Sequence, residues 1–346
     1  MLSTQQFSLL LLKWNHDFNR RNMPWKGIND PYKIWLSEII LQQTRVDQGE
    51  KYYNSITTKY LTVSDLSLAK DDEVYKLWQG LGYYNRCRNM LHTARHIHQE
   101  LNGIFPKRYE DILNLKGIGD YTAAAIASFA YNLPYAVVDG NVVRVLSRVF
   151  GLNQSFYDAA GKKFFQSLAL ELLNKKKSAE YNQAIMDLGA TVCKPQLPEC
   201  NQCPFEKKCI AKIENRINEL PVKKEKLKLK VRHFHFFVFE DKTSFYILKR
   251  TSKDIWNQLY TFYMIETENE KVKSKDNIIL KSINNSPQVF QQVLSHQKIQ
   301  GYFHINNKIT EKEIAHLNVF KINKYELEAY AFPRLLISFF QKNNYL

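Results

Sequence analysis

The 346-residue chain lacks several features that define large classes of protein. It has no apolar run near the roughly 20 residues that span a bilayer. The N-terminal residues Met-Leu-Ser-Thr-Gln-Gln have neither the basic start nor the cleavage pattern of a signal peptide. Cysteine is scarce, with five residues, and this excludes a dense secreted disulfide framework. Acidic residues are also few, since 34 Asp and Glu face 49 Lys and Arg and leave a net charge of +15. These features predict an intracellular protein with a polyanionic partner, either nucleic acid or an anionic membrane surface.

What is present indicates two or three domains, because 45% of the residues are hydrophobic and the chain is long enough for more than one core. Apolar residues recur at helical spacing from residue 1 to about 212. Helices are expected over residues 33–45, 71–78, 85–100, 120–130, 141–149, 160–174 and 180–190.

A basic segment then separates this helical part from a C-terminal region of different composition. Residues 223–232 hold six cations and one acid, so residues 213–231 are expected to form a linker. The linker either remains solvated or lies along phosphates. Residues 232–346 are richer in aromatic and β-branched residues and predict a small α+β domain. Strands are expected at 233–239, 244–249, 259–265 and 301–305, and a helix at 333–341.

Four of the five cysteines fall within 17 residues, at positions Cys193, Cys200, Cys203 and Cys209. Four thiolates at this spacing are able to surround one metal centre, and the spacing alone allows either zinc or an iron–sulfur cluster. Four buried thiols without a metal are the plainer alternative.

A second motif is Leu115-Lys116-Gly117-Ile118-Gly119-Asp120-Tyr121, followed by an alanine-rich helix. Gly117 and Gly119 allow a tight turn with exposed amides, and the helix that follows presents its positive end. This pattern indicates a helix–hairpin–helix that binds a DNA phosphate, although a Gly-x-Gly alone is also an ordinary turn.

Two carboxylates stand out from their surroundings. Glu38 shares a helical face with Ile34 and Leu41, and burial would raise its pKa toward that of a general acid at neutral pH. The alternative is a buried salt bridge. Asp139 precedes the helix expected at 141–149, where it either caps the helix or stabilises a developing cation in a cleft.

These motifs together resemble the helix–hairpin–helix DNA glycosylases, and within them the adenine DNA glycosylases of the MutY type. The resemblance rests on residues 23–25, 31–38, 41–46, 78–84, 138–142, 186–190 and the cysteine spacing. It implies a mainly α N-terminal domain over 1–212, with the hairpin at about 113–130 and a four-iron four-sulfur cluster loop at 193–209. The thinner match over 232–346 resembles a Nudix-like domain.

The resemblance also implies roles for residues of a catalytic site. Glu38 would protonate the adenine, Asp139 would stabilise the oxocarbenium-like sugar and Asn141 would position the site by hydrogen bonding. Tyr121 would pack against the sugar or shape the pocket. It occupies the position where the endonuclease III type has a lysine nucleophile. A phenol forms no Schiff base, and this favours a monofunctional glycosylase.

Other residues are expected to contact the DNA or read the lesion. Gln43 and Tyr83 match intercalating positions, although Tyr83 in its Gly-flanked turn is otherwise an ordinary core aromatic. Arg21 and Lys26 match basic positions near the adenine pocket, and Lys26 departs from the arginine common in the family. Ser295 and His296 would read 8-oxoguanine, although a Ser-His pair in a polar loop is otherwise unremarkable. A Nudix box is absent, so pyrophosphate hydrolysis is not expected.

The sequence therefore predicts a bacterial enzyme of the cytosol and nucleoid that acts as a monomer on double-stranded DNA with 8-oxoguanine:adenine mispairs. It would excise the adenine, contain a 4Fe-4S cluster and need no membrane. Two alternatives remain: an endonuclease III-like glycosylase with a different base preference, and a non-catalytic iron–sulfur protein that binds distorted DNA.

Overall fold

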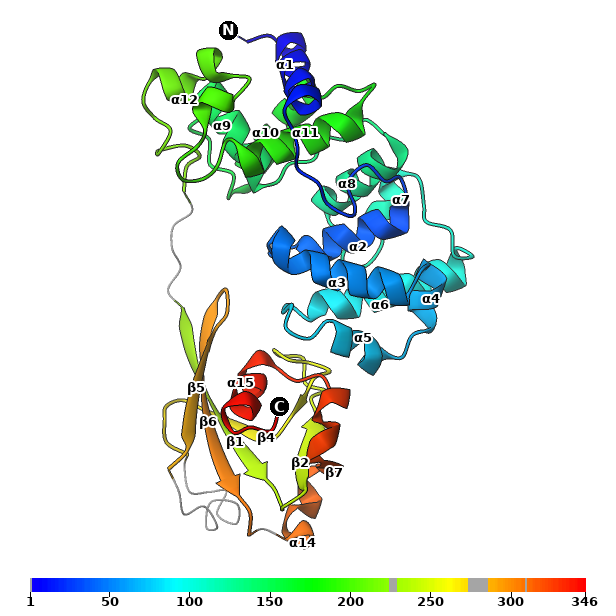
Figure 1. Ribbon diagram of the computed structural model, residues 1–346, viewed down its shortest axis with the longest axis vertical. Coiled ribbons are helices and arrows are strands. Elements are labelled where there is room, and N and C mark those ends of the chain that lie inside the picture. The colour runs from blue at the N-terminus through cyan, green and yellow to red at the C-terminus, as the bar shows by residue number, and fades with distance from the viewer. Residues whose placement is uncertain (1, 224–228, 273–285, 309) are drawn as a thin grey trace. The chain divides into compact units, whose positions relative to one another are not determined.

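The computed structural model describes residues 2–223, 229–272, 286–308 and 310–346, which Figure 1 shows as a ribbon. Contacts divide the chain into two compact units. The first contains Met1–Leu68 and Arg88–Glu225, and the second contains Ala69–Cys87 and Lys226–Leu346. The middle of the expected linker, residues 224–228, lies outside the described residues.

The part of the chain up to residue 213 is helical, as its apolar spacing predicts. Its α-helices are α1 (Thr4–Asp17), α2 (Pro31–Leu41), α3 (Val46–Lys59), α4 (Val63–Leu68), α5 (Asp71–Leu77), α6 (Asn85–Glu100), α7 (Tyr109–Leu113), α8 (Asp120–Tyr131), α9 (Gly140–Phe150), α10 (Ala159–Leu172), α11 (Ser178–Thr191) and α12 (Ile210–Ile213).

Helix α2 shows how local sequence sets an element that carries the site. Asp30 is its N-cap and accepts hydrogen bonds from the amides of Tyr32 and Lys33, and Pro31 is the first helical residue. The expected helix over 33–45 was too long at its C-terminal end. The helix ends at Leu41 because Gln43 adopts the left-handed conformation, with a φ of 56°.

Helices α1, α9, α10 and α11 enclose one hydrophobic core of the first unit. Phe7 of α1 stacks on Phe205 of the cysteine loop, with ring centroids 4.4 Å apart, and both rings are fully buried. The cysteine loop is therefore attached to the core of the helical unit through an aromatic contact.

The second unit contains two sheets. One has the strand order β4 (Tyr263–Thr267), β1 (Lys230–Phe239), β6 (Gln297–Asn306) and β5 (Gln288–Val293), in which β1 and β6 are parallel. The other has the order β3 (Tyr260–Thr261), β2 (Ser244–Lys249) and β7 (Phe320–Asn323). The strand expected at 259–265 is split into β3 and β4, while β5 and β7 were not predicted.

Helix α15 (Arg334–Lys342) packs on the four-stranded sheet, and α14 (Glu311–Ile314) precedes β7. Phe339 of α15 stacks on Phe303 of β6 at 4.4 Å between ring centroids. Gly301 allows this approach, because a Cβ there would lie 2.6 Å from the side chain of Leu335. The second unit is therefore an α+β domain with an aromatic core.

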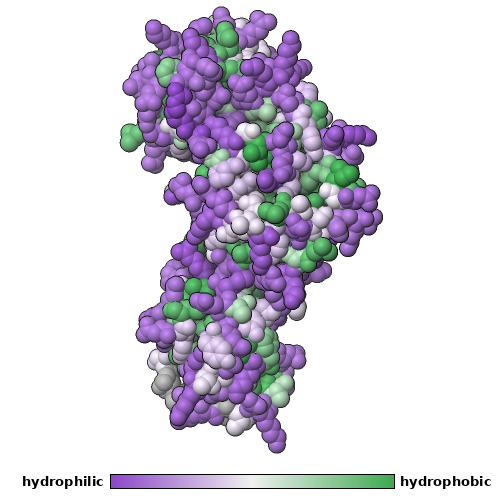
Figure 2. Space-filling model, turned by 45° about the vertical axis from the view of Figure 1, so that its right-hand side comes forward, coloured by the Kyte–Doolittle hydropathy of each residue, from purple (hydrophilic) through white to green (hydrophobic). Residues whose placement is uncertain are grey.

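Hydrophilic residues cover most of the face shown in Figure 2, and hydrophobic residues appear there as separate patches. No helix in the described part of the chain combines the length and the apolarity needed to cross a bilayer.

The contact between α9 and α11 gives a prediction about stability. A Cβ on Gly189 of α11 would lie 2.6 Å from the Cβ of Asn141 and 2.9 Å from its carbonyl oxygen. Gly189→Ala should therefore push the helices apart and cost about 1–3 kcal/mol. We expect a melting temperature several degrees lower by calorimetry. Gly140→Ala is the control, because a Cβ there meets no atom within 4 Å. Equal melting temperatures for the two variants would contradict the prediction.

Candidate active site

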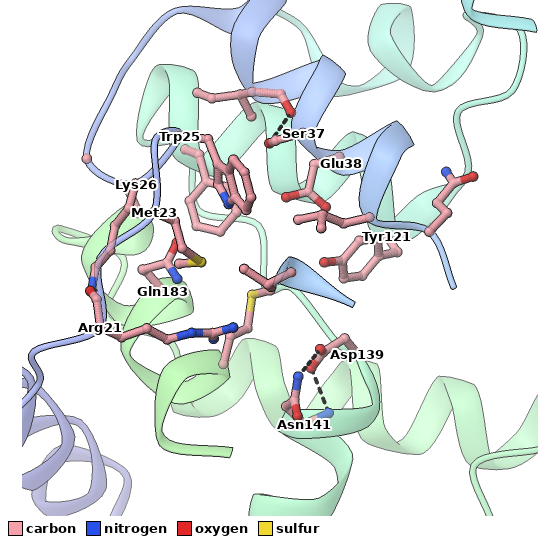
Figure 3. A pocket seen from close by; sticks show the side chains of 18 of the residues that line it. Arg21, Met23, Trp25, Lys26, Ser37, Glu38, Tyr121, Asp139, Asn141 and Gln183 are labelled. Carbon is pink, nitrogen blue, oxygen red and sulfur yellow. Dashed lines mark hydrogen bonds between the residues drawn. The ribbon is translucent and has the colours of Figure 1, made fainter. Parts of the chain in front are cut away.

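Seven of the residues selected from the sequence line one cavity of about 910 Å³ in the first unit (Figure 3). They come from separate helices and from the loop before α2, and they are Arg21, Lys26, Glu38, Gln43, Tyr121, Asp139 and Asn141. Its volume and its mixture of apolar walls with a few polar groups are typical of a small-molecule or cofactor site. The fold thus brings together positions up to 120 residues apart, from Arg21 to Asn141.

Glu38 lies on the wall formed by α2 and is only 7% exposed. Its helical neighbours Ile34 and Leu41 also line the cavity, so the shared face expected from the sequence is present. Burial raises the pKa of Glu38 to about 7, and the nearby charge of Asp139 adds to this. The Tyr121 hydroxyl donates a hydrogen bond to the carboxylate and opposes the rise in pKa. Glu38 therefore has access to both protonation states near neutral pH.

Tyr121 projects from the first turn of α8 toward Glu38 (Figure 3). Burial and the charges of Glu38 and Asp139 raise the pKa of the Tyr121 phenol well above its usual range. The phenol therefore stays protonated and acts as a hydrogen-bond donor in the cavity. The glycines before it form the predicted turn, with Gly117 at a φ of 83° and Gly119 as the N-cap of α8. Both glycines are exposed and neither lines the cavity.

Asp139 takes the capping role, one of the two roles that the sequence left open. It is the N-cap of α9 and accepts hydrogen bonds from the amides of Asn141 and Val142 at 2.9 and 2.8 Å. The Asn141 side-chain amide donates to its second oxygen at 2.7 Å. Burial raises the pKa of Asp139, while these three donors and the positive charge of Arg144 lower it. The capping bonds fix the carboxylate at the cavity wall.

Arg144 is a site residue that the sequence interpretation missed. This side chain is 9% exposed and its guanidinium donates to Asn141 Oδ1 at 2.7 Å. It also donates to the carbonyl oxygens of Gly189 at 2.8 Å and Cys193 at 2.7 Å. One side chain therefore links Asn141 to the end of α11 and the start of the cysteine loop. The available signal was an arginine three residues after Asn141 in a valine-rich helix.

Asp187 anchors the two cations of the cavity wall. Its side chain is fully buried and accepts hydrogen bonds from Arg21 at 2.9 Å and Lys26 at 2.8 Å. Asn19 and Gln183 also donate to it. One carboxylate thus faces two cations, and the trio retains a net positive charge. The sequence motif included Asp187, but its two cationic partners lie more than 160 residues away and were not predicted.

The four cysteines of the predicted metal site line a second cavity. All four are free thiols, and within the described residues no three His, Cys, Asp or Glu side chains converge on the position of a single metal ion. Arg148 Nη1 lies 3.5 Å from Cys193 Sγ, and its remaining N–H groups donate to the carbonyls of Lys194, Pro195 and Leu220. The thiols surround a space beside the buried Arg148 guanidinium. Burial raises the pKa of the Cys200, Cys203 and Cys209 thiols, so the free side chains stay protonated.

The residues expected to read the opposite base belong to the second unit. Tyr83 is 44% exposed and has a φ of 49°, and its hydroxyl contacts Ser295 Oγ. Ser295 and His296 are exposed at the tip of the β5–β6 hairpin. Tyr83 is therefore not a core aromatic, and the second unit brings it together with the predicted reading loop.

Comparisons with known proteins agree with this geometry. Residues 36–169 match the model of the HhH-GPD superfamily of base excision DNA repair proteins. An adenine DNA glycosylase of Buchnera aphidicola subsp. Schizaphis graminum is 36% identical over 301 residues, which are 86% of this chain and 83% of the relative. That of the subspecies Acyrthosiphon pisum is 35% identical over 264 residues, 76% of this chain and 75% of the relative.

Among solved structures, a thermostable thymine-DNA glycosylase matches with a TM-score of 0.56 and 31% identity, over 61% of this chain and 97% of that one. The helical part of the chain thus has a glycosylase fold. The sequence relatives extend beyond this part into the α+β domain. On this evidence the chain belongs to the family of adenine DNA glycosylases, which are enzymes of base excision repair.

Proposed function

We propose that the enzyme removes adenine paired with 8-oxoguanine, or with guanine, from double-stranded DNA and leaves an abasic site. The observation that carries this proposal is the arrangement of Glu38, a buried carboxyl with a pKa near 7, on the cavity wall beside Tyr121 and in the electrostatic field of Asp139. Cleavage of an N-glycosidic bond requires a proton donor and a fixed negative charge around one cavity.

The reaction follows from these groups. Adenine is inaccessible inside the duplex, so the enzyme must flip it into the cavity. Protonated Glu38 donates its proton to the adenine ring, the bond from the sugar C1′ to the base breaks, and neutral adenine departs. Asp139 stabilises the oxocarbenium-like sugar, with Asn141 holding its orientation through the 2.7 Å hydrogen bond. Water then adds to C1′ and loses a proton.

Tyr121 supports a monofunctional reaction. Its phenol forms no Schiff base with the sugar, so strand cleavage through a covalent intermediate at this position is not part of the mechanism. Arg21 and Lys26 supply donors for the ring nitrogens of the flipped base. The exposed amides around Gly117 and Gly119, ahead of α8, are placed to bind a backbone phosphate.

We further propose that residues 232–346 form a Nudix-like module that reads the base opposite the adenine, after a catalytic domain over 1–212 and a linker over 213–231. Tyr83 enters the base stack, and Ser295 and His296 contact the oxidised base. The contact between the hydroxyls of Tyr83 and Ser295 supports the proposal that both side chains act on the same base. The monomer acts on chromosomal DNA in the bacterial cytosol, a placement that the Buchnera relatives favour.

The cysteine loop is proposed to hold a 4Fe-4S cluster through Cys193, Cys200, Cys203 and Cys209. These thiols line a common cavity without converging on one ion, and a cluster with four corners fits such a set better than a single zinc. When bound, the cluster supplies a rigid, charged anchor for the loop. The chain's own Arg148 places its cation next to the thiol of Cys193.

A different base preference is the second candidate, because a structural neighbour is described as a thymine-DNA glycosylase. Adenine has basic ring nitrogens that a general acid protonates to make the base a better leaving group, whereas thymine has no basic ring nitrogen. The buried, protonated Glu38 therefore favours adenine. A duplex with thymine opposite guanine is therefore the comparison substrate in the excision experiment.

The first prediction concerns the general acid. Single-turnover excision of adenine opposite 8-oxoguanine should slow as the pH rises through about 7, because Glu38 then loses its proton. Glu38→Gln should reduce the rate by at least roughly a thousandfold, since an amide donates no proton at neutral pH. Strand breaks should need alkaline treatment. Excision of thymine by the wild type in place of adenine would contradict the proposed base preference.

The second prediction concerns the cluster. The purified protein should contain about four iron and four sulfide per chain, and Cys209→Ser should lose most of both. Cys87→Ser is the matched control, because Cys87 is buried in the second unit and is not one of the cavity thiols. Elemental analysis that gives one zinc per chain would replace the cluster with a structural zinc site.

The third prediction concerns Arg144. Arg144→Met removes the donors to Asn141, Gly189 and Cys193, so the single-turnover rate should fall by roughly tenfold to a hundredfold. Arg144→Lys should recover only part of the rate, because an ammonium cannot span the same acceptors. Circular dichroism checks that the helices remain. A wild-type rate in a folded Arg144→Met protein would show that the link is unimportant.

A further inference from the structure

The segment Ala69–Cys87 lies within the helical part of the sequence but packs in the second unit with residues 226–346. It contains α5 and the turn that carries Tyr83. Its attachment to residues 226–346 includes a set of polar contacts at separate points along the segment. These contacts connect the segment that carries Tyr83 to the domain that contains the β5–β6 hairpin.

The first attachment is Asp72, in the first turn of α5. Its Oδ1 accepts a hydrogen bond from Lys249 Nζ at 2.6 Å, and its Oδ2 accepts one from Tyr260 OH at 2.9 Å. Lys249 on β2 and Tyr260 on β3 are cross-strand partners, and the ammonium lies 5.5 Å from the centroid of the phenol ring. Both oxygens of one carboxylate are thus used by two neighbouring strands.

The second attachment follows along the same side of the segment. Lys76 Nζ donates to the carbonyl of Tyr330 at 3.2 Å, and Gln79 Oε1 accepts from the amide of Phe332 at 3.0 Å. Positions 72, 76 and 79 are spaced at four and three residues, which places them on one face of a helical segment. The backbone at Ala331 is in turn tied to β3, because its carbonyl accepts from the amide of Tyr260 at 2.9 Å. Asp72 and Gln79 therefore bind two neighbouring parts of the domain, β3 and the backbone at Phe332, which this hydrogen bond connects.

The third attachment is the contact between the hydroxyls of Tyr83 and Ser295. Both side chains are exposed, so neither is held in place by burial of its own. Their meeting consequently depends on how the rest of the segment is fixed. Lys249 and Asp72 have exposed fractions of 29% and 47%, so this ion pair is partly solvated and separable without unfolding the domain.

We propose that Asp72 is a positioning residue that sets the preference for the base opposite the adenine. It fastens the segment carrying Tyr83 to the domain carrying Ser295, so that both side chains reach the same base. This inference rests on the proposed reading role of Tyr83 and Ser295. Asp72 itself contacts neither the DNA nor the adenine cavity; without it, the enzyme keeps its chemistry and loses discrimination between 8-oxoguanine and guanine.

The test compares single-turnover adenine excision opposite 8-oxoguanine and opposite guanine for the wild type, Asp72→Ala and Lys249→Met. We expect each variant to lose about threefold to tenfold of the preference for 8-oxoguanine, with the rate opposite guanine nearly unchanged. The double variant should be no worse than either single variant, because both remove the same link. Glu73→Ala is the matched control, since it removes an exposed acid from the same helical turn.

Amide hydrogen exchange of the free full-length protein gives a second readout that does not depend on catalysis. Exchange at Phe332, whose amide donates to Gln79, should accelerate in Asp72→Ala and not in Glu73→Ala. An unchanged preference in Asp72→Ala, or unchanged exchange at Phe332, would overturn the inference. A wild type with no preference for 8-oxoguanine would instead refute the proposed reading function, so the two failures are distinguishable.

Discussion

The desolvation of Glu38 is the constraint on which the site depends. Removing a carboxylate from water costs free energy, and the protein meets this cost by allowing the group to hold its proton at a pH near 7. The cavity supplies a single strong donor, the Tyr121 hydroxyl, so the carboxylate is only partly stabilised. A cation closer to Glu38 would lower the pKa of its carboxyl group, which would then be ionised at neutral pH and could not donate a proton. The Asp187 carboxylate pairs with both Arg21 and Lys26 and neutralises one of their two positive charges.

Asp139 is also desolvated, and burial raises its pKa, but it receives more hydrogen bonds than Glu38. Two backbone amides at the start of α9 and the amide of Asn141 donate to it, and these donors favour its ionised form. Arg144 then connects Asn141 to the end of α11 and to Cys193. The position of the anion is therefore set by packing between α9 and α11, and Gly189 permits that packing. The same helices support the cysteine loop, so its order and the geometry of the site share one framework.

Local sequence signals predicted the elements that depend on them. Apolar periodicity gave α6 its observed bounds, and Asp30 with Pro31 marked the start of α2. Helix α3 was missed because its sequence is polar and contains Gly49, a residue whose fit depends on the close approach of Leu41. Strand β5 was missed because it is an edge strand with glutamines between its apolar residues. Glu38 and Asp139 stood out from their local sequence, and the resemblance to a family gave them catalytic roles. The roles of Arg144 and Asp187 were not predicted, because the partners Cys193 of Arg144 and Arg21 and Lys26 of Asp187 become neighbours only in the folded chain.

A direct measurement of the protonation state of Glu38 tests the central claim independently of any substrate. Infrared difference spectra of the wild type and Glu38→Gln isolate the carbonyl stretch of the protonated carboxyl group across a pH series. This band should be present at pH 6 and should disappear with a midpoint near pH 7. A Glu38 carboxyl group that is already fully ionised at pH 5 would contradict its role as the general acid.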